Sequence, residues 1–177
     1  MPDKAIKRIA LTGPESSGKT TLCKQLASHY KTLWVPEFAR GYMEKLNRPY
    51  TSDDILFAAK EQLKAEEEMI STSNKLLFAD TELIIAKIWC EDVFGFCPGW
   101  IAERIEKKNY DLYLLAAPDL PWEKDPVREN PNRREYFFNL YLNEIETRKF
   151  NYEIISGNGE DRFHNAVKAV EKFLKSG

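Results

Sequence analysis

The sequence predicts a single α/β domain, residues 1–177, in which a parallel β-sheet carries helices on both faces. Three observations predict this fold. Five short apolar segments with strand character alternate with segments whose apolar residues recur at helical spacing. The third strand segment, residues 75–80, is almost continuously apolar, as expected of a strand buried on both faces. The length suits one domain with a sizeable core.

The chain opens with a strand over residues 6–13 and a helix over residues 19–30. Leu22, Leu26 and Tyr30 fall on one stripe of this helix. The connecting residues 13–20, GPESSGKT, match the pattern G-x-x-x-x-G-K-[ST] in full. Glycines let successive backbone N–H groups point inward, and the helix N-terminus adds its positive end. The sequence therefore predicts a phosphate-binding loop.

The residue types of this loop indicate a nucleoside triphosphate, ATP with Mg²⁺. Lys19 is expected to reach the β- and γ-phosphates, and the Thr20 hydroxyl is expected to bind the metal ion. The predicted nucleotide contacts are Gly13, Glu15, Ser16, Ser17, Gly18, Lys19, Thr20 and Thr21.

The next elements are a strand over residues 32–37 and helical stretches over residues 38–46 and 52–71. Thr51 stands three residues before Asp54, a spacing typical of a capping box with Asp in place of Glu. Helices inserted between the second and third strands are typical of the acceptor pocket of a small-molecule kinase.

Asp80 ends the buried strand 75–80 and is predicted to be the second protein group on the metal. The carboxyl ends of parallel strands form the edge at which ligands bind. The alternative is that Asp80 caps the helix that begins near Glu82. Helices are expected over residues 82–93 and 99–108, followed by a strand over residues 111–117.

Residues 118–134 hold four prolines and four arginines or lysines besides Trp122, a composition that breaks secondary structure. We expect a mobile loop here that acts as a lid. A helix over residues 135–149, a strand over residues 152–156 and a helix over residues 161–175 complete the predicted chain.

Composition excludes several classes of partner. The formal net charge is −2, so no basic surplus exists to neutralise a nucleic-acid backbone. The sequence contains neither a membrane-length apolar run nor a secretion signal, so we expect a cytoplasmic protein.

A GTPase is not indicated, because Asp92-Val-Phe-Gly95 lies in a helical run and Asn74-Lys75 lacks the following Asp. A small-molecule kinase remains.

Five segments carry a closer resemblance: GPESSGKTTL, PEFAR, FADTE, PDLPWEKDPVR and YEIISGNGEDR. Over nearly the whole chain they resemble the ribosylnicotinamide kinase domain of the NadR family. The resemblance implies a P-loop kinase fold with strand order 2-3-1-4-5 and ATP-dependent phosphorylation of the 5′-hydroxyl of nicotinamide riboside. Since the first strand begins at about Lys7, we expect no adenylyltransferase half of the kind found in bifunctional members.

The resemblance also implies roles for individual residues. It places Glu37 and Arg40 with Asp80 at the acceptor, Trp122, Asp125 and Arg128 in the lid, and Asn158 beside the adenine. Each has a structural alternative: Arg40 as a helix surface charge, Trp122 as loop packing, and Asn158 as a turn before the helix.

One departure concerns the acceptor ring. The family pattern places ring-stacking aromatics just before the Glu of the second segment and on the long helix that follows. Here these places hold Pro36 and the carboxylates Glu66–Glu68. The acceptor is therefore left open as nicotinamide riboside or a related nucleoside. The preference for ATP or GTP and the oligomeric state are also open.

In the predicted mechanism a carboxylate accepts the proton of the acceptor hydroxyl, while Lys19 and Arg128 neutralise charge on the transferred phosphoryl group. Glu37 is the predicted base and Asp80 the metal-side acid, because a carboxylate on a metal ion is a poor base. Exchange of these two roles is the alternative. The alternative function is a regulatory module that binds ATP or a pyridine nucleotide without efficient turnover.

Overall fold

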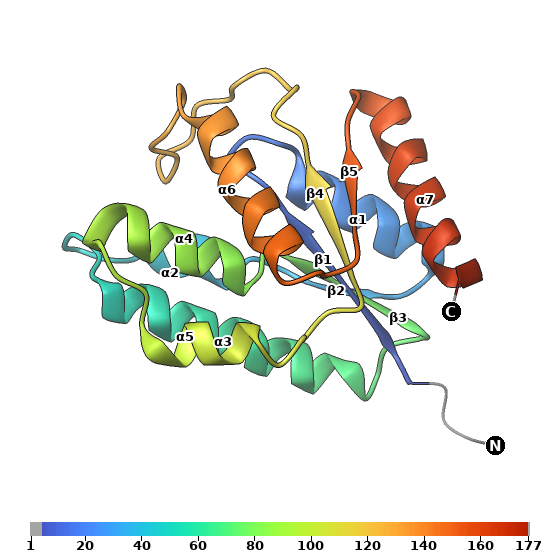
Figure 1. The fold of residues 1–177 in the computed structure, drawn as a ribbon, viewed down its shortest axis with the longest axis horizontal. Helices are drawn as coiled ribbons and strands as arrows, with labels where there is room; N and C mark the ends of the chain where they lie inside the picture. Colours follow the sequence, from blue (N-terminus) through green and yellow to red (C-terminus); the bar gives the residue numbers. More distant parts are fainter. Residues whose placement is uncertain (1–4, 177) are drawn as a thin grey trace.

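The computed structural model describes residues 5–176 and confirms the predicted parallel sheet (Figure 1). Its five strands are all parallel and follow the predicted order β2-β3-β1-β4-β5. The strands are β1 (Lys7–Thr12), β2 (Leu33–Val35), β3 (Leu76–Asp80), β4 (Leu112–Ala116) and β5 (Tyr152–Ile155). The central strand β1 therefore has β3 on one side and β4 on the other.

The helices also follow the predicted pattern, with ends shifted by a few residues. They are α1 (Lys19–Tyr30), α2 (Phe38–Met43), α3 (Ser52–Ile70), α4 (Leu83–Phe94), α5 (Gly99–Ile105), α6 (Arg134–Thr147) and α7 (Gly159–Ser176). The capping box at the start of α3 is present, since the Thr51 N–H donates to the Asp54 carboxylate at 2.8 Å. Residues 117–133 contain no helix or strand.

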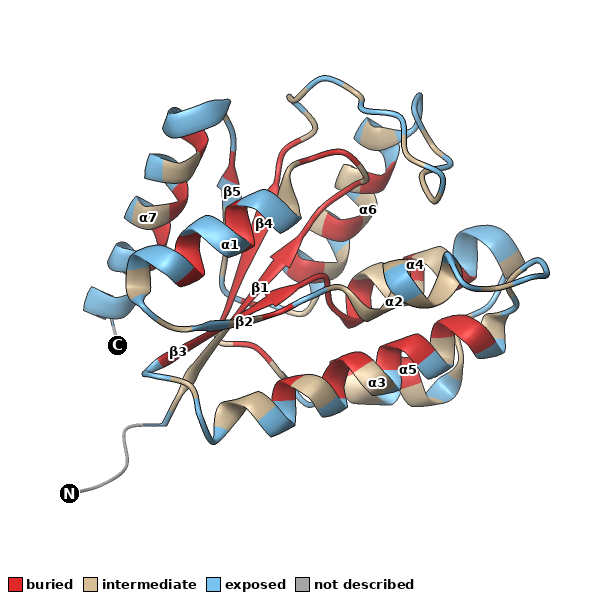
Figure 2. Ribbon diagram, turned by 180° about the vertical axis from the view of Figure 1, so that it is seen from behind, coloured by how far each residue is buried: buried red, intermediate tan, exposed pale blue. Residues whose placement is uncertain are grey.

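Two apolar layers flank the sheet. On one face α1 and α7 pack against β1, β3 and β4 through residues such as Leu22, Phe78 and Val170. On the other face α3, α4, α5 and α6 cover the sheet, with Ile55, Ile84 and Ile145 among the buried residues. Figure 2 shows buried residues along the central strands and on the inward sides of these helices. Alternate residues of the central strands feed the two layers, as the period of a strand requires.

This topology brings separate segments to one edge. Leu11 of β1 pairs in register with Asp80 of β3 and with Leu114 of β4. The segments that follow these strands therefore emerge next to each other, and the phosphate loop lies between them.

Within residues 5–176, no helix combines the length and the apolar character needed to cross a bilayer.

Candidate active site

The loop at residues 13–18 has the backbone that a phosphate-binding nest requires. Gly13 has φ 137°, and a Cβ there would stand 2.7 Å from the Ala116 carbonyl oxygen of β4. Gly18 has φ 77°, and its Cβ would stand 2.9 Å from Leu120. Glycine at these positions lets the loop adopt left-handed conformations and lie close against the end of β4. The loop passes directly into α1, which aims the helix N-terminus at the same space.

Lys19 lies at the start of α1 and lines the cavity. Its ammonium group donates to the carbonyl oxygens of Gly13 at 2.9 Å and Pro14 at 2.8 Å. Burial lowers the pKa of this ammonium, and the nearby charges of Glu37, Asp80 and Glu15 oppose that shift. Lys19 is thus a half-buried cation held by its own loop and near three carboxylates.

Thr20 and Asp80 form the pair expected to hold a divalent cation. The Thr20 hydroxyl donates to Asp80 Oδ2 at 2.5 Å. Asp80 Oδ1 is buried without a hydrogen-bond partner in the described part of the chain. Burial raises the pKa of Asp80, whereas the Thr20 hydroxyl and the Lys19 charge lower it. A hydroxyl beside a carboxylate with a free oxygen suits Mg²⁺, which takes few protein ligands and completes its shell with phosphates and water.

No group of three or more His, Cys, Asp and Glu residues suited to a metal ion occurs within residues 5–176.

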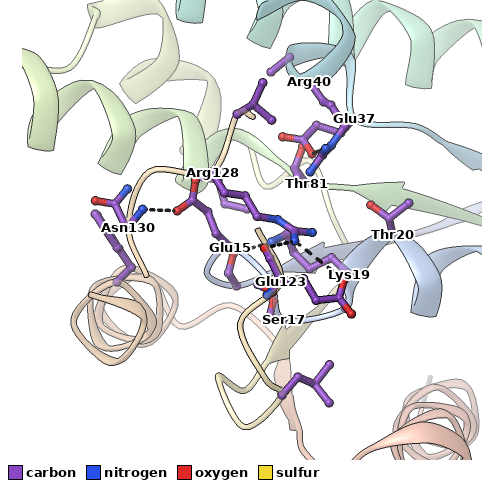
Figure 3. A pocket seen from close by; sticks show the side chains of 18 of the residues that line it. Glu15, Ser17, Lys19, Thr20, Glu37, Arg40, Thr81, Glu123, Arg128 and Asn130 are labelled. Atoms are coloured by element: carbon purple, nitrogen blue, oxygen red, sulfur yellow. Dashed lines mark hydrogen bonds and ion pairs between the residues drawn. The ribbon is translucent and has the colours of Figure 1, made fainter. Parts of the chain in front are cut away.

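Glu37 and Arg40 enter the cavity from the other side, at the junction of β2 and α2. Burial raises the pKa of Glu37, and the positive charges of Lys19 and Arg40 oppose the rise. Arg40 Nε lies 4.0 Å from Glu37 Oε2. Figure 3 shows Glu37, Arg40 and Thr81 together on one side of the pocket, with Lys19 and Glu15 across from them. Glu37 and Asp80, two carboxylates whose pKa values are raised by burial, both lie near Lys19.

The loop after β4 is attached to the phosphate loop by side chains. The Glu15 carboxylate accepts from the backbone N–H of Glu129 at 3.1 Å and of Asn130 at 2.9 Å. The Ser16 hydroxyl accepts from the Glu123 N–H at 2.9 Å. In Figure 3 Asn130 and Glu15 are joined by a dashed line. Two side chains of the motif's variable positions thus bind the loop that was predicted to be a lid.

The lid residues named from the sequence occupy different places. Arg128 lines the cavity and donates to the Glu123 carbonyl oxygen at 2.6 Å. Asp125 accepts from Arg40 at 2.6 Å, which joins the loop after β4 to α2. Trp122 lies in a separate recess that Asp125 and Arg128 also line, with the Arg134 guanidinium 5.9 Å from its ring centroid. Arg40 therefore makes specific ion pairs, while Trp122 packs within the loop in this structure.

The segment after β5 contributes Arg162, which the sequence reasoning did not single out. The Arg162 side chain donates to the carbonyl oxygens of Ser17 and Ala117, each at 2.8 Å, and to Asp119 at 2.6 Å. This buried arginine joins α7 to the phosphate loop and to the end of β4. Asn158 is exposed and is not among the lining residues, although its neighbour Gly159 is.

These elements enclose one cavity of about 600 Å³, a size typical of small-molecule sites. All eight predicted phosphate-loop contacts line it. Four aromatic residues line it as well: Tyr50 before α3, Trp89 of α4, and Phe137 and Tyr141 of α6. Aromatics are thus present in the cavity, but they do not stand at Pro36 or Glu67, where the family pattern places them. They come from segments whose convergence no local sequence signal reveals.

Residues 8–162 match the AAA domain family AAA_28. The chain belongs to this family. The match begins in β1 and ends in α7, so it takes in the glycine loop, the junction of β2 and α2, and residues 117–133.

Among curated proteins, the AAA domain chain is similar to the trifunctional NAD biosynthesis/regulator protein NadR. It is 26% identical to the protein of Escherichia coli K12, over 96% of this chain and 43% of the relative. It is 23% identical to the protein of Salmonella typhimurium LT2, again over 96% and 43%. The chain therefore spans less than half the length of these relatives. The resemblance to NadR stated from the motifs is confirmed.

Solved structures agree on the fold. A NadR protein in complex with NR superposes with a TM-score of 0.78 at 21% identity, over 96% of this chain and 51% of that one. A NadR protein in complex with NAD and AMP-PNP gives 0.74 at 22% identity, over 96% and 49%. Deoxyadenosine kinase from M. mycoides gives 0.66 at 10% identity, over 93% and 99%. Together these likenesses support a P-loop kinase fold.

Proposed function

We propose that this chain is an ATP-dependent kinase that phosphorylates the 5′-hydroxyl of nicotinamide riboside or a related nucleoside. One observation carries the proposal: Lys19, Thr20 and the carboxylate of Glu37 line one cavity, and the buried Asp80 accepts a hydrogen bond from Thr20 directly behind that lining. A nucleotide-binding module needs only the first two. A carboxylate with a raised pKa beside the phosphate loop is what transfer to a hydroxyl requires in addition.

The nucleotide would lie on residues 13–21, its phosphates held by backbone N–H groups and Lys19. Thr20 and Asp80 would hold Mg²⁺, which supplies positive charge to the phosphates when it is bound. Arg128 would add a charge from the lid side. Enclosure by residues 118–134 would keep water away from the phosphoryl group.

At the acceptor end, Glu37 would accept a hydrogen bond from the hydroxyl group and take its proton as the phosphoryl group moves. Its raised pKa makes it a better proton acceptor than a solvated carboxylate. Asp80, with Thr20 on one oxygen, would remain on the metal side. Support for nicotinamide riboside comes from the NadR relatives, and support for a nucleoside in general comes from the kinase fold.

The experiment is a transfer assay with ATP and Mg²⁺ against a nucleoside panel that includes nicotinamide riboside. The expected result is a monophosphate of at least one nucleoside, formed in step with ADP and detected by mass spectrometry. A chain that binds ATP and phosphorylates no member of the panel would instead be the regulatory module. Lys168→Ala, an exposed change on α7, is the control for protein quality.

A further inference from the structure

The acceptor end contains a series of contacts that the mechanism above does not use. The Trp89 ring of α4 meets the Tyr50 ring edge-on, with centroids 5.1 Å apart. The indole Nε1–H donates to the Tyr50 hydroxyl at 3.1 Å. The Tyr50 hydroxyl donates to the Glu129 carboxylate at 3.0 Å. Indole, phenol and carboxylate therefore run in sequence from the wall of the cavity to the lid.

Glu129 has a second attachment through its backbone. Its N–H donates to the Glu15 carboxylate, as does the N–H of Asn130. Glu15 belongs to the phosphate loop, whereas Tyr50 belongs to the acceptor end. One lid residue is thus bound to both ends of the cavity, by its side chain to one and by its main chain to the other.

The polar groups of the aromatic pair are engaged with each other and with the lid. Trp89 has one donor, which Tyr50 receives, and the single O–H of Tyr50 goes to Glu129. Neither ring keeps a donor for a ligand, so the pair offers ring surface to the cavity. Ring surface binds flat rings by stacking, and it tolerates differences in ring substituents.

We propose that Tyr50 and Trp89 form the subsite for a flat ring of the acceptor, and that Glu129 couples occupancy of this subsite to the position of the lid. The proposal rests on the proposed function for what binds at the acceptor end. A ring packed on Trp89 restrains Tyr50, and the Tyr50 hydroxyl holds Glu129. Glu129 in turn holds the main chain against Glu15 and keeps the preceding residue, Arg128, at the cavity. Glu129 is therefore a positioning residue.

The link between the subsite and the lid, which is the Tyr50–Glu129 hydrogen bond, is tested by a double-mutant cycle in the full chain. Tyr50→Phe removes the hydroxyl but keeps the ring, and Glu129→Ala removes the carboxylate but keeps the backbone N–H. The readout is the rate of proteolytic cleavage within residues 118–134, with AMP-PNP and Mg²⁺ alone and with nicotinamide riboside added. Each single change should raise the cleavage rate roughly threefold to tenfold. The double change should do no more than either single change, because both break the same link.

The matched control is Tyr152→Phe, which breaks another tyrosine–glutamate bond, from Tyr152 to Glu146 at 2.7 Å, at residues that do not line the cavity. It should leave cleavage of the lid unchanged. Additive effects of Tyr50→Phe and Glu129→Ala would overturn the link, and so would wild-type cleavage rates in both single variants.

The ring subsite is tested with Trp89→Leu and Trp89→Phe. The leucine variant should raise the dissociation constant of nicotinamide riboside roughly fivefold to a hundredfold and leave that of AMP-PNP unchanged, whereas phenylalanine should restore most of the loss. Unchanged nicotinamide riboside affinity in Trp89→Leu would overturn the subsite. If the wild type binds no nucleoside at all, the proposed function fails together with the subsite. The cleavage rates measured with AMP-PNP and Mg²⁺ alone would then still test whether the Tyr50–Glu129 hydrogen bond holds the lid in place.

Discussion

The two ends of the cavity are built in different ways. The phosphate end comes from one continuous stretch, residues 13–21, which carries its own glycines, lysine and hydroxyl groups. The acceptor end comes from α2, Tyr50, α4, α6 and the lid, which are far apart along the chain. Phosphate is the same in every nucleotide, so a local backbone nest is enough to bind it. Acceptors differ, and their pocket depends on tertiary packing.

This difference predicts that changes at the phosphate end act on every substrate, whereas changes at the acceptor end act selectively. The largest effect is expected for Lys19→Ala. Loss of a charge that stabilises the transition state should lower kcat by roughly a hundredfold or more with every acceptor. Circular dichroism should show an unchanged fold, because Lys19 bonds to its own loop rather than to the core. More than about a tenth of wild-type turnover would contradict the assignment of the loop.

The next effect separates the two carboxylates. Glu37→Gln should bind ATP and Mg²⁺ normally and lose roughly a hundredfold or more of the chemical step, as expected for loss of a general base. Asp80→Asn should weaken the metal site and be partly rescued by raised Mg²⁺. The measurement is single-turnover transfer over a Mg²⁺ titration. Near wild-type turnover of Glu37→Gln, with Asp80→Asn inactive at every Mg²⁺ concentration, would reverse the two roles.

A smaller effect is expected at the lid. Arg128→Ala should lower kcat by about tenfold and change KM less, since its charge is most useful when negative charge spreads over the phosphoryl oxygens. Steady-state kinetics with the acceptor varied measures both constants. Arg104→Ala, on α5 away from the cavity, removes another arginine that pairs with a glutamate and serves as control. A rise in KM with kcat unchanged would show that Arg128 binds substrate without assisting transfer.

The smallest effect is expected for Asp54, which lies in the first turn of α3. Hydrogen bonds from Arg48, Thr51 and Tyr42 hold the pKa of Asp54 below its usual value. A carboxylate with a lowered folded-state pKa stabilises the protein above its unfolded pKa, about 3.9, and this stabilisation is lost as the pH falls through the folded value. Asp54→Asn should lower Tm by about 2–4 °C at neutral pH, as for loss of a helix cap. The Tm of this variant should also fall less than that of the wild type as the pH is lowered.

Thermal unfolding between neutral pH and about pH 2, where the unfolded carboxylate is protonated, measures this. The neighbouring exposed change Asp53→Asn is the control. Equal curves of Tm against pH for the wild type and Asp54→Asn would show that the hydrogen bonds of Asp54 do not stabilise α3.

The fold and the backbone of the loop at residues 13–18 could be predicted from the sequence because both depend on local signals. The apolar period predicted the strands and helices, and the glycine spacing predicted the nest. Arg40 lines the cavity, but its partner Asp125 lies 85 residues away, and no local pattern encodes that pair. The aromatics Tyr50 and Trp89 were missed for the same reason, since they meet only after α3 and α4 pack together. Arg162 had a signal, because it ends the YEIISGNGEDR segment, but its carbonyl partners required the structure.

In the proposed function, one cavity brings a phosphate loop and an acceptor hydroxyl together for transfer. The most direct measurement uses ATP labelled in its γ-phosphate, mixed with the enzyme, Mg²⁺ and nicotinamide riboside for a single turnover. The label should move to the nucleoside faster than inorganic phosphate appears, and Lys19→Ala should abolish both. Bound ATP that transfers no label to nicotinamide riboside or any other nucleoside of the panel, or that loses it only to water, would show that this chain is not a nucleoside kinase.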